Sequence, residues 1–196
     1  MLSCVTEKRI LFLRAINVGG TAKLPMAELR DLAQQLGATE VSTYIASGNL
    51  LCVPPDAPAP GHPAPGHTGV SDPQAFDRAL EQAIEQRYGF FREVISRTRA
   101  QLVEALAAFP FEQGDPRFDY VTFLSGVPTA TAVEAARQYE TFNDRWMVVA
   151  DHQFIQYAEG AGKSQMNGVA IARALGVAGT ARNLNSVRKL IELAAS

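Results

Sequence analysis

The sequence predicts an α+β fold in which two tandem ferredoxin-like (βαββαβ) subdomains are followed by a C-terminal helix. Two observations carry this prediction. Each half of the chain orders its short apolar runs and amphipathic stretches as strand, helix, strand, strand, helix, strand. Each half also has a turn signal between its two middle strands. We expect the first subdomain at residues 1–97, and a linking helix, the second subdomain and the C-terminal helix at residues 98–196.

The first strand is expected at residues 9–16 (RILFLRAI), a nearly continuous apolar run that is typical of a central strand covered on both faces. A helix should follow, with Pro25 in its first turn and Gly37 just beyond its end. The apolar stripe of this helix consists of Leu29, Leu32, Ala33 and Leu36.

The rest of the first half is expected to form strands at residues 40–46, 50–53 and 90–96 and a helix at residues 73–88. Between the first two of these strands, Ser47-Gly48-Asn49 has the composition of a hairpin turn. Asp72 is placed to cap the helix.

The second half repeats this order after a linking helix at residues 99–108. We expect strands at residues 119–124, 145–150, 153–158 and 177–182, and helices at residues 129–139, at residues 165–175 and from about Asn185 onward. Asp151-His152 would be the turn between the two middle strands. No residue-level repeat is visible, so the duplication rests on element order alone.

The composition is that of a globular protein, with 47% hydrophobic and 19% charged residues. It lacks an apolar run of about 18 residues that could cross a membrane, and its start lacks the features of a signal peptide. Cys4 and Cys52 are too few for a disulfide framework or a metal cluster. We therefore expect a cytoplasmic protein with no metal or other cofactor and no membrane partner.

Charge is distributed unevenly along the chain. Residues 54–160 carry 8 basic and 15 acidic side chains, whereas residues 161–196 carry 5 basic and 1 acidic. The acidic middle and a pI near 5.9 argue against general nucleic-acid binding, which depends on many phosphate contacts. A small local anion site is compatible with this distribution.

Two polar motifs at element ends are the candidate binding site: RAINVGG at residues 14–20 and GTARN at residues 179–183. Their glycines permit unusual backbone angles, and their Arg, Asn and Thr side chains supply hydrogen-bond donors. The candidate ligand-binding residues are Arg14, Asn17, Gly19, Gly20, Lys23, Ser47, Gly48, Asn49, Lys163, Thr180, Arg182 and Asn183. The alternative is structural: the glycines only permit a turn, and Arg14 pairs with a carboxylate.

Arg14 and Arg182 are expected to serve one anion site in a cleft between the two subdomains, because pockets favour such interfaces. Asn183 or Asn185 would cap the last helix. The N–H groups and the dipole at the start of that helix would favour an anion beside Arg182.

No catalytic constellation is visible in the sequence. Residues 160–164 (GAGKS) end like a Walker A loop, but Tyr157 stands at the position of its first glycine. Lys163 and Ser164 are therefore expected to begin a helix, with Ser164 as its N-cap. Three acidic residues are expected to be solvated turn carboxylates: Asp119, Asp144 and Asp151.

The chain resembles a bacterial family known as domain of unknown function 1697. The resemblance lies in four ordered pieces: RAINVGG (14–20), LPMAELRDL (24–32), TYIASGN (43–49) and TARNLNSVRKL (180–190). The chain departs from the family pattern at Ala15, Ala46, Leu184 and Ser186, where the family has Gly, Gln, Trp and Thr. The resemblance implies two ferredoxin-like subdomains and supplies neither an activity nor catalytic residues.

The leading hypothesis is a binding protein for a small anionic ligand that bears phosphate or carboxylate. One alternative is an enzyme acting on a phosphorylated or nucleotide substrate, with Lys163 or a turn carboxylate as catalyst. The other is a protein-interaction module without a small-molecule site. The sequence is compatible with a monomer and with a homodimer, and it leaves open whether the protein is an enzyme.

Residues 54–72 (PPDAPAPGHPAPGHTGVSD) are expected to form a flexible Pro/Gly-rich surface insertion, although His62 and His67 could bind a metal ion transiently. Replacing the insertion with a short Gly/Ser turn should leave the melting temperature within a few degrees. Doubling the length of a loop costs only about 0.6 kcal/mol, so shortening it changes stability little. Loss of soluble, cooperatively unfolding protein in thermal melts would contradict the prediction.

Overall fold

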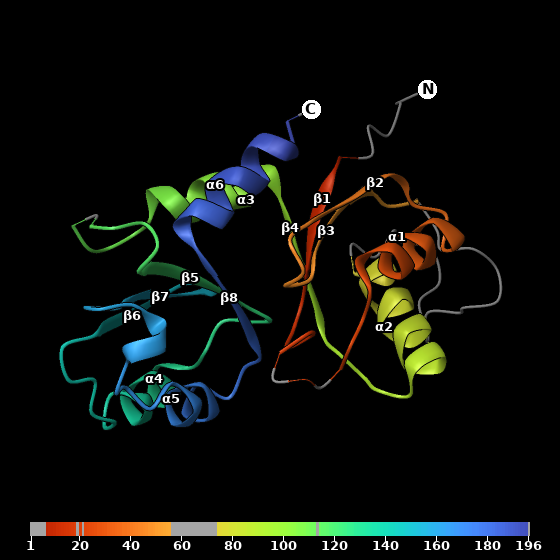
Figure 1. Ribbon diagram of the computed structural model, residues 1–196. Coiled ribbons are helices and arrows are strands. Elements are labelled where there is room, and N and C mark those ends of the chain that lie inside the picture. Colours follow the sequence, from red (N-terminus) through yellow and green to blue (C-terminus); the bar gives the residue numbers. More distant parts are fainter. Residues whose placement is uncertain (1–6, 19, 21, 56–73, 113, 196) are drawn as a thin grey trace. The chain divides into compact units, whose positions relative to one another are not determined.

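The computed structural model describes residues 7–18, 20, 22–55, 74–112 and 114–195, whose backbone is drawn in colour in Figure 1. The chain divides into two compact units. Unit 1 comprises the chain up to Arg99 together with Glu192–Ser196, and unit 2 comprises Ala100–Ile191. Most of the 54–72 insertion, its two histidines and Asp72 lie outside the described residues.

Unit 1 contains one antiparallel four-stranded sheet and two helices. Its elements are β1 (Arg9–Leu13), α1 (Met26–Gln35), β2 (Thr39–Tyr44), β3 (Asn49–Val53), α2 (Ala75–Tyr88) and β4 (Val94–Thr98). The strands lie in the order β2-β3-β1-β4, so the first strand is central.

Unit 2 contains a second antiparallel four-stranded sheet. The elements from the linking helix onward are α3 (Arg99–Ala107), β5 (Asp119–Leu124), α4 (Ala130–Ala136), β6 (Arg145–Val149), β7 (His152–Gln156), the 3₁₀ turn η1 (Ala161–Lys163), α5 (Gly168–Leu175), β8 (Gly179–Asn183) and α6 (Leu184–Leu193). The strand order is β6-β7-β5-β8. The described chain is therefore a mixed α+β protein with two antiparallel sheets and six α-helices.

The core of unit 1 follows from the apolar pattern of β1. Leu11 and Leu13 pack against α1 and α2 in one cluster. Ile10 and Phe12 alternate with them and have no exposed surface, so both faces of the strand are covered, as its sequence predicts. The predicted stripe of α1 is buried, and Gly37 follows the helix at φ +93°, a conformation that favours glycine.

Apolar side chains pack on both faces of the sheet of unit 2. On one face, Ile155 packs with Ile171 and Leu175 of α5. Figure 1 shows α4 and α5 together on this face, consistent with the many contacts between the two helices. On the opposite face, the ring of Phe154 meets that of Phe109, just after α3, at 5.7 Å between centroids.

Several predicted boundaries are wrong. β1 ends at Leu13 rather than at residue 16, because the chain turns sharply at Ala15, where φ is +50°. β7 already begins at His152, so the turn before it is Ala150-Asp151. Ser164 does not cap a helix: α5 starts later and is capped by Asn167, whose side chain accepts a hydrogen bond from Ala170 N.

Asp77 of α2 is a buried carboxylate at the edge of the core of unit 1. Its Oδ2 accepts a hydrogen bond of 2.5 Å from Ser96 Oγ, while its Oδ1 has no partner among the described residues. Burial raises the pKa of Asp77 to about 6, and the Ser96 hydrogen bond opposes this shift only in part. The folded state therefore binds the Asp77 proton more tightly than the unfolded state, in which the pKa is about 3.9.

This difference predicts that unit 1 loses stability as the pH rises from about 4 to about 6. The loss attributable to Asp77 is about 3 kcal/mol and is complete above the folded-state pKa. Asp77→Asn should remove this part of the pH dependence, as measured by urea unfolding at pH 4 and pH 7. Asp31→Asn, at an exposed position of α1, is the control. Equal pH dependence in Asp77→Asn and the wild type would contradict the prediction.

Candidate functional site

The loop between β1 and α1 has an unusual backbone. Positive φ angles occur at Ala15 (50°), Asn17 (56°), Gly20 (76°) and Ala22 (48°). Asn and Gly tolerate this left-handed region, whereas Ala loses roughly 1–2 kcal/mol in it. Such a loop keeps its shape only when surrounding contacts impose it. Gly19 lies outside the described residues.

Asn17 supplies those contacts with its side chain. Its Nδ2 donates to the carbonyls of Leu24 (3.0 Å) and Ala46 (2.9 Å), and its Oδ1 accepts from Leu24 N (2.9 Å). The loop is thereby bound to the start of α1 and to the turn between β2 and β3. Two of the predicted motifs, residues 14–20 and 43–49, therefore meet in unit 1.

The turn between β2 and β3 is equally constrained. Asn49 is fully buried, and its Nδ2 donates to Tyr44 O (2.9 Å) and Ser47 Oγ (3.1 Å). Gly48 has φ +79°, and a Cβ there would lie 2.8 Å from Cδ1 of Ile16. Ser47, Gly48 and Asn49 thus hold the turn against the loop that follows β1.

Three cations lie at this end of unit 1. Arg14 and Lys23 are exposed, and Arg14 N donates to Glu93 O (3.0 Å), just before β4. Arg92 is half-buried: its Nε donates to Ala15 O (3.2 Å), and its guanidinium lies 5.1 Å from the centre of the Phe90 ring. The sequence did not identify Arg92, because its approach to the loop follows from the pairing of β1 with β4.

The second motif, around Arg182, lies in unit 2. Thr180 and Arg182 are buried on β8, and Arg182 Nη1 donates to Thr180 Oγ1 and Ala181 O, both at 2.8 Å. Burial lowers the pKa of Arg182 to about 10. Asn183 Oδ1 accepts from Ser186 N (2.9 Å), so Asn183 rather than Asn185 caps α6.

The structure also reveals a correspondence that the sequence hides. Arg97 of β4 lies opposite Ile10 of β1, and Arg182 of β8 lies opposite Val121 of β5. The two positions are equivalent in the two sheets. In each unit the pair that contains the arginine lies three positions from the pair at the other end of the strand, which is Leu13–Val94 in unit 1 and Leu124–Gly179 in unit 2. Each arginine is 8% exposed and donates through Nη1 to the carbonyl of the preceding residue. The equivalence of Arg97 and Arg182 becomes visible only when the two sheets are aligned by their strand register.

The GAGKS segment forms a short turn between β7 and α5 rather than the start of a helix. Lys163 is exposed and lies 3.4 Å from Glu159, in the short turn η1. Ser164 Oγ donates to Asp144 Oδ2 at 2.5 Å and accepts from Met166 N at 3.2 Å. These contacts fix the chain before α5, and no contact of Lys163 with the other candidate residues is found in the described ranges.

The prediction of solvated carboxylates is wrong for Asp119 and Asp144, which are both buried. Asp119 accepts hydrogen bonds from Gln156 Nε2 (2.9 Å) and Gly114 N (3.2 Å). Asp144 accepts from Ala158 N (2.9 Å) as well as from Ser164. Both carboxylates therefore fasten loops to the sheet. The described residues contain no cluster of His, Cys, Asp or Glu that could hold a metal ion.

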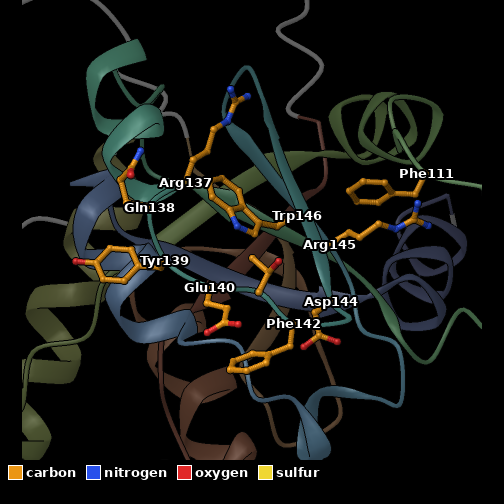
Figure 2. Close-up of a pocket in the computed structure, with 10 residues that line it drawn as sticks. Phe111, Arg137, Gln138, Tyr139, Glu140, Phe142, Asp144, Arg145 and Trp146 are labelled. Carbon is orange, nitrogen blue, oxygen red and sulfur yellow. The ribbon is translucent and has the colours of Figure 1, made fainter.

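Unit 2 also has an open groove beside the start of β6, with a volume of about 670 Å³ (Figure 2). The residues that line it are Phe111, Arg137, Gln138, Tyr139, Glu140, Thr141, Phe142, Asp144, Arg145 and Trp146. Arg145 extends over the ring of Phe111, at 5.0 Å from its centre, and donates to Gln156 Oε1. Arg137 pairs with Glu134 at 2.8 Å. Four of the ten lining residues are aromatic, and the groove carries two acidic side chains, Glu140 and Asp144, as well as the two arginines.

Asn17→Ala should destabilise the protein by about 3 kcal/mol. The substitution removes three hydrogen bonds worth roughly 1 kcal/mol each, and it places a third alanine at positive φ in the same loop. Urea unfolding monitored by circular dichroism would measure this. Asn143→Ala, at an exposed position of unit 2, is the control and should stay within about 0.5 kcal/mol of the wild type. An equally small effect at Asn17 would show that other contacts hold the loop.

Comparisons with known proteins agree with this architecture. No protein with curated annotation matches the chain. A solved structure, that of the conserved bacterial protein SP0830 from Streptococcus pneumoniae, is similar with a TM-score of 0.69 over 95% of this chain and 98% of that one. At 20% sequence identity this likeness concerns the fold alone. Every described helix is too short or too polar to cross a bilayer. The sequence profile of the family described as protein of unknown function (DUF1697) matches residues 6–64 and 66–154, and the chain belongs to that family.

Proposed function

We propose that the protein binds a small anionic ligand, bearing phosphate or carboxylate, and that residues 14–24 of unit 1 form the anion site. The observation that carries the proposal is the hydrogen bond from Arg92 Nε to Ala15 O, because it adds a third cation to a loop that already holds Arg14 and Lys23. Residues 14–24 contain no acidic side chain that would oppose an anion.

The fold of each unit supports this location. Both units follow the order strand, helix, strand, strand, helix, strand with equivalent strand neighbours, and we assign both to the ferredoxin-like topology. In unit 2 the connection from β5 to α4 is residues 125–129 (SGVPT), which is short and uncharged. The longer, cationic connection is therefore a feature of unit 1 that the topology does not require.

The rigidity of the loop also supports anion binding. The backbone N–H groups of Arg14, Asn17 and Leu24 already donate to groups of unit 1, so in this proposal cationic side chains hold the anion. Because Asn17 holds the loop in place, little ordering of the backbone would oppose binding. In this proposal Arg14, Lys23 and Arg92 contact the anion, whereas Asn17, Ser47, Gly48 and Asn49 position them.

The prediction that Arg14 and Arg182 serve one site joins a residue of unit 1 to a residue of unit 2, and it stays a prediction. Arg182 and Thr180 are buried and bonded within their own strand, which favours a structural role for that motif. Gly19, Gly20, Lys163 and Asn183 likewise stay predicted ligand contacts. The cytoplasmic location is also still an expectation.

Inorganic phosphate should raise the melting temperature, because a ligand at about 100 times its dissociation constant adds about 2.7 kcal/mol to stability. Arg14→Ala and Arg92→Ala should each weaken phosphate binding roughly 10-fold or more in calorimetry, since a hydrogen bond to a charged group contributes roughly 1.5–3 kcal/mol. Arg173→Ala, at an exposed arginine of α5, is the matched control and should bind phosphate like the wild type.

Three different results would contradict this proposal, and each points to a different conclusion. An unchanged phosphate affinity in both loop variants would remove the site from unit 1. Loss of the phosphate response in Arg182→Ala alone would place the anion site at the second motif. The quantity to compare is the shift in melting temperature caused by phosphate, because the substitution of a buried side chain also changes the baseline melting temperature. No response to phosphate, sulfate or carboxylates in the wild type would leave the interaction-module hypothesis.

A further inference from the structure

The four outer strands of the two sheets differ in how their edges are protected. β2 is interrupted by a register shift between Thr39 and Ser42, and its exposed Glu40 has φ +50° and pairs with Lys8 at 2.9 Å. Bulges and charges of this kind prevent edge strands from pairing with other chains. Strands β4 and β8 lead directly into helices and present buried arginines, Arg97 and Arg182.

β6 has fewer of these protections. Its five residues, RWMVV, pair with β7 in one continuous register, without a bulge or a proline. No described strand pairs with its other side. Arg145, at its first position, is its only charged residue. An open edge with this composition is a template for pairing with another strand.

Apolar side chains are also concentrated around this edge. Met147 is 40% exposed and Val149 38% exposed, and both alternate along β6 on the same face as Arg145. Tyr139 (42%) and Phe142 (53%) are exposed in the segment that leads into β6 (Figure 2). Exposed apolar side chains along an open strand edge are typical of interaction sites.

We propose that β6 pairs antiparallel with β6 of a second copy, so that the two unit 2 sheets form one continuous sheet across a two-fold axis at Met147. In this register Met147 faces Met147 of the second copy, and Arg145 faces Val149. No like charges therefore stand opposite each other, which an antiparallel pair requires. Trp146 faces Val148 on the other side of the sheet.

The same register gives charge complementarity at the ends of the strands. The β6–β7 turn of one copy, with Asp151 directly after Ala150, extends past the start of β6 of the other copy. There it approaches Arg145 and the groove with Tyr139 and Phe142. Asp151, which pairs with His152 of its own chain at 3.1 Å, then lies diagonally across from Arg145, whose contacts with Gln156 and the Phe111 ring leave its charge uncompensated by them. Asp144, which lies opposite Ala150 in this register, is buried and accepts hydrogen bonds from Ser164 and Ala158. The occupant of the edge is therefore a second copy of this chain, and a peptide from another protein is the outcome that the test separates from it.

Sedimentation equilibrium from low to several hundred micromolar protein should show a reversible dimer. Met147→Lys should weaken the dimer at least 100-fold, because two lysines would meet at the two-fold axis, and Met147→Glu should do the same. Val169→Lys is the matched control: Val169 is 74% exposed on α5 of the same unit and should leave the dimer unchanged. Circular dichroism should show that all variants fold, since the altered side chains are exposed.

Mixing Met147→Lys with Met147→Glu tests the register itself. The opposite charges would face each other across the axis, so a heterodimer should form at concentrations where each variant alone is monomeric. A wild-type monomer throughout the concentration range would overturn the proposal and leave the edge to another partner. A dimer that persists in Met147→Lys, or two variants that fail to combine, would also overturn it.

Discussion

The geometry of the candidate site depends on the side chain of Asn17. It occupies a left-handed backbone position that asparagine tolerates, and its amide satisfies three backbone groups of Leu24 and Ala46. Ile16, which is 1% exposed, anchors the same loop in the core beside Gly48. The hydrogen bonds of Asn17 and the burial of Ile16 therefore fix the loop, and these contacts determine where Arg14 and Lys23 lie.

Much of the fold could be predicted from the sequence, because apolar periodicity reports burial. The stripe of α1 and the two covered faces of β1 are examples. The end of β1 could not be predicted, because Ala15 and Ile16 continue the apolar run. Apolar residues are expected both in a buried strand and in a turn that packs against the core. The start of α5 was misplaced for a related reason: Ser164 and Asn167 are both good cap residues, and tertiary contact with Asp144 decides between them.

The candidate site could be predicted in residue type but less well in role. An asparagine that binds backbone carbonyls and one that binds a ligand have the same sequence signal, so Asn17 and Asn49 were identified without their partners. The burial of Arg182 follows from the alternation of β8, which places it on the same face as Thr180. Arg92 was missed because only the pairing of β1 with β4 brings it to Ala15.

The two units share a topology and a buried arginine at one register position, yet they differ where each meets solvent. Unit 1 has the long cationic connection after its first strand and a protected edge at β2. Unit 2 has a short uncharged connection at the same point and an open apolar edge at β6. Burying Arg97 and Arg182 opposes stability unless their hydrogen bonds are satisfied, so these positions constrain both units alike. The shared interior therefore explains the common fold, whereas the differences at the surface are the features on which the two proposals rest: the cationic connection of unit 1 and the open strand edge of unit 2.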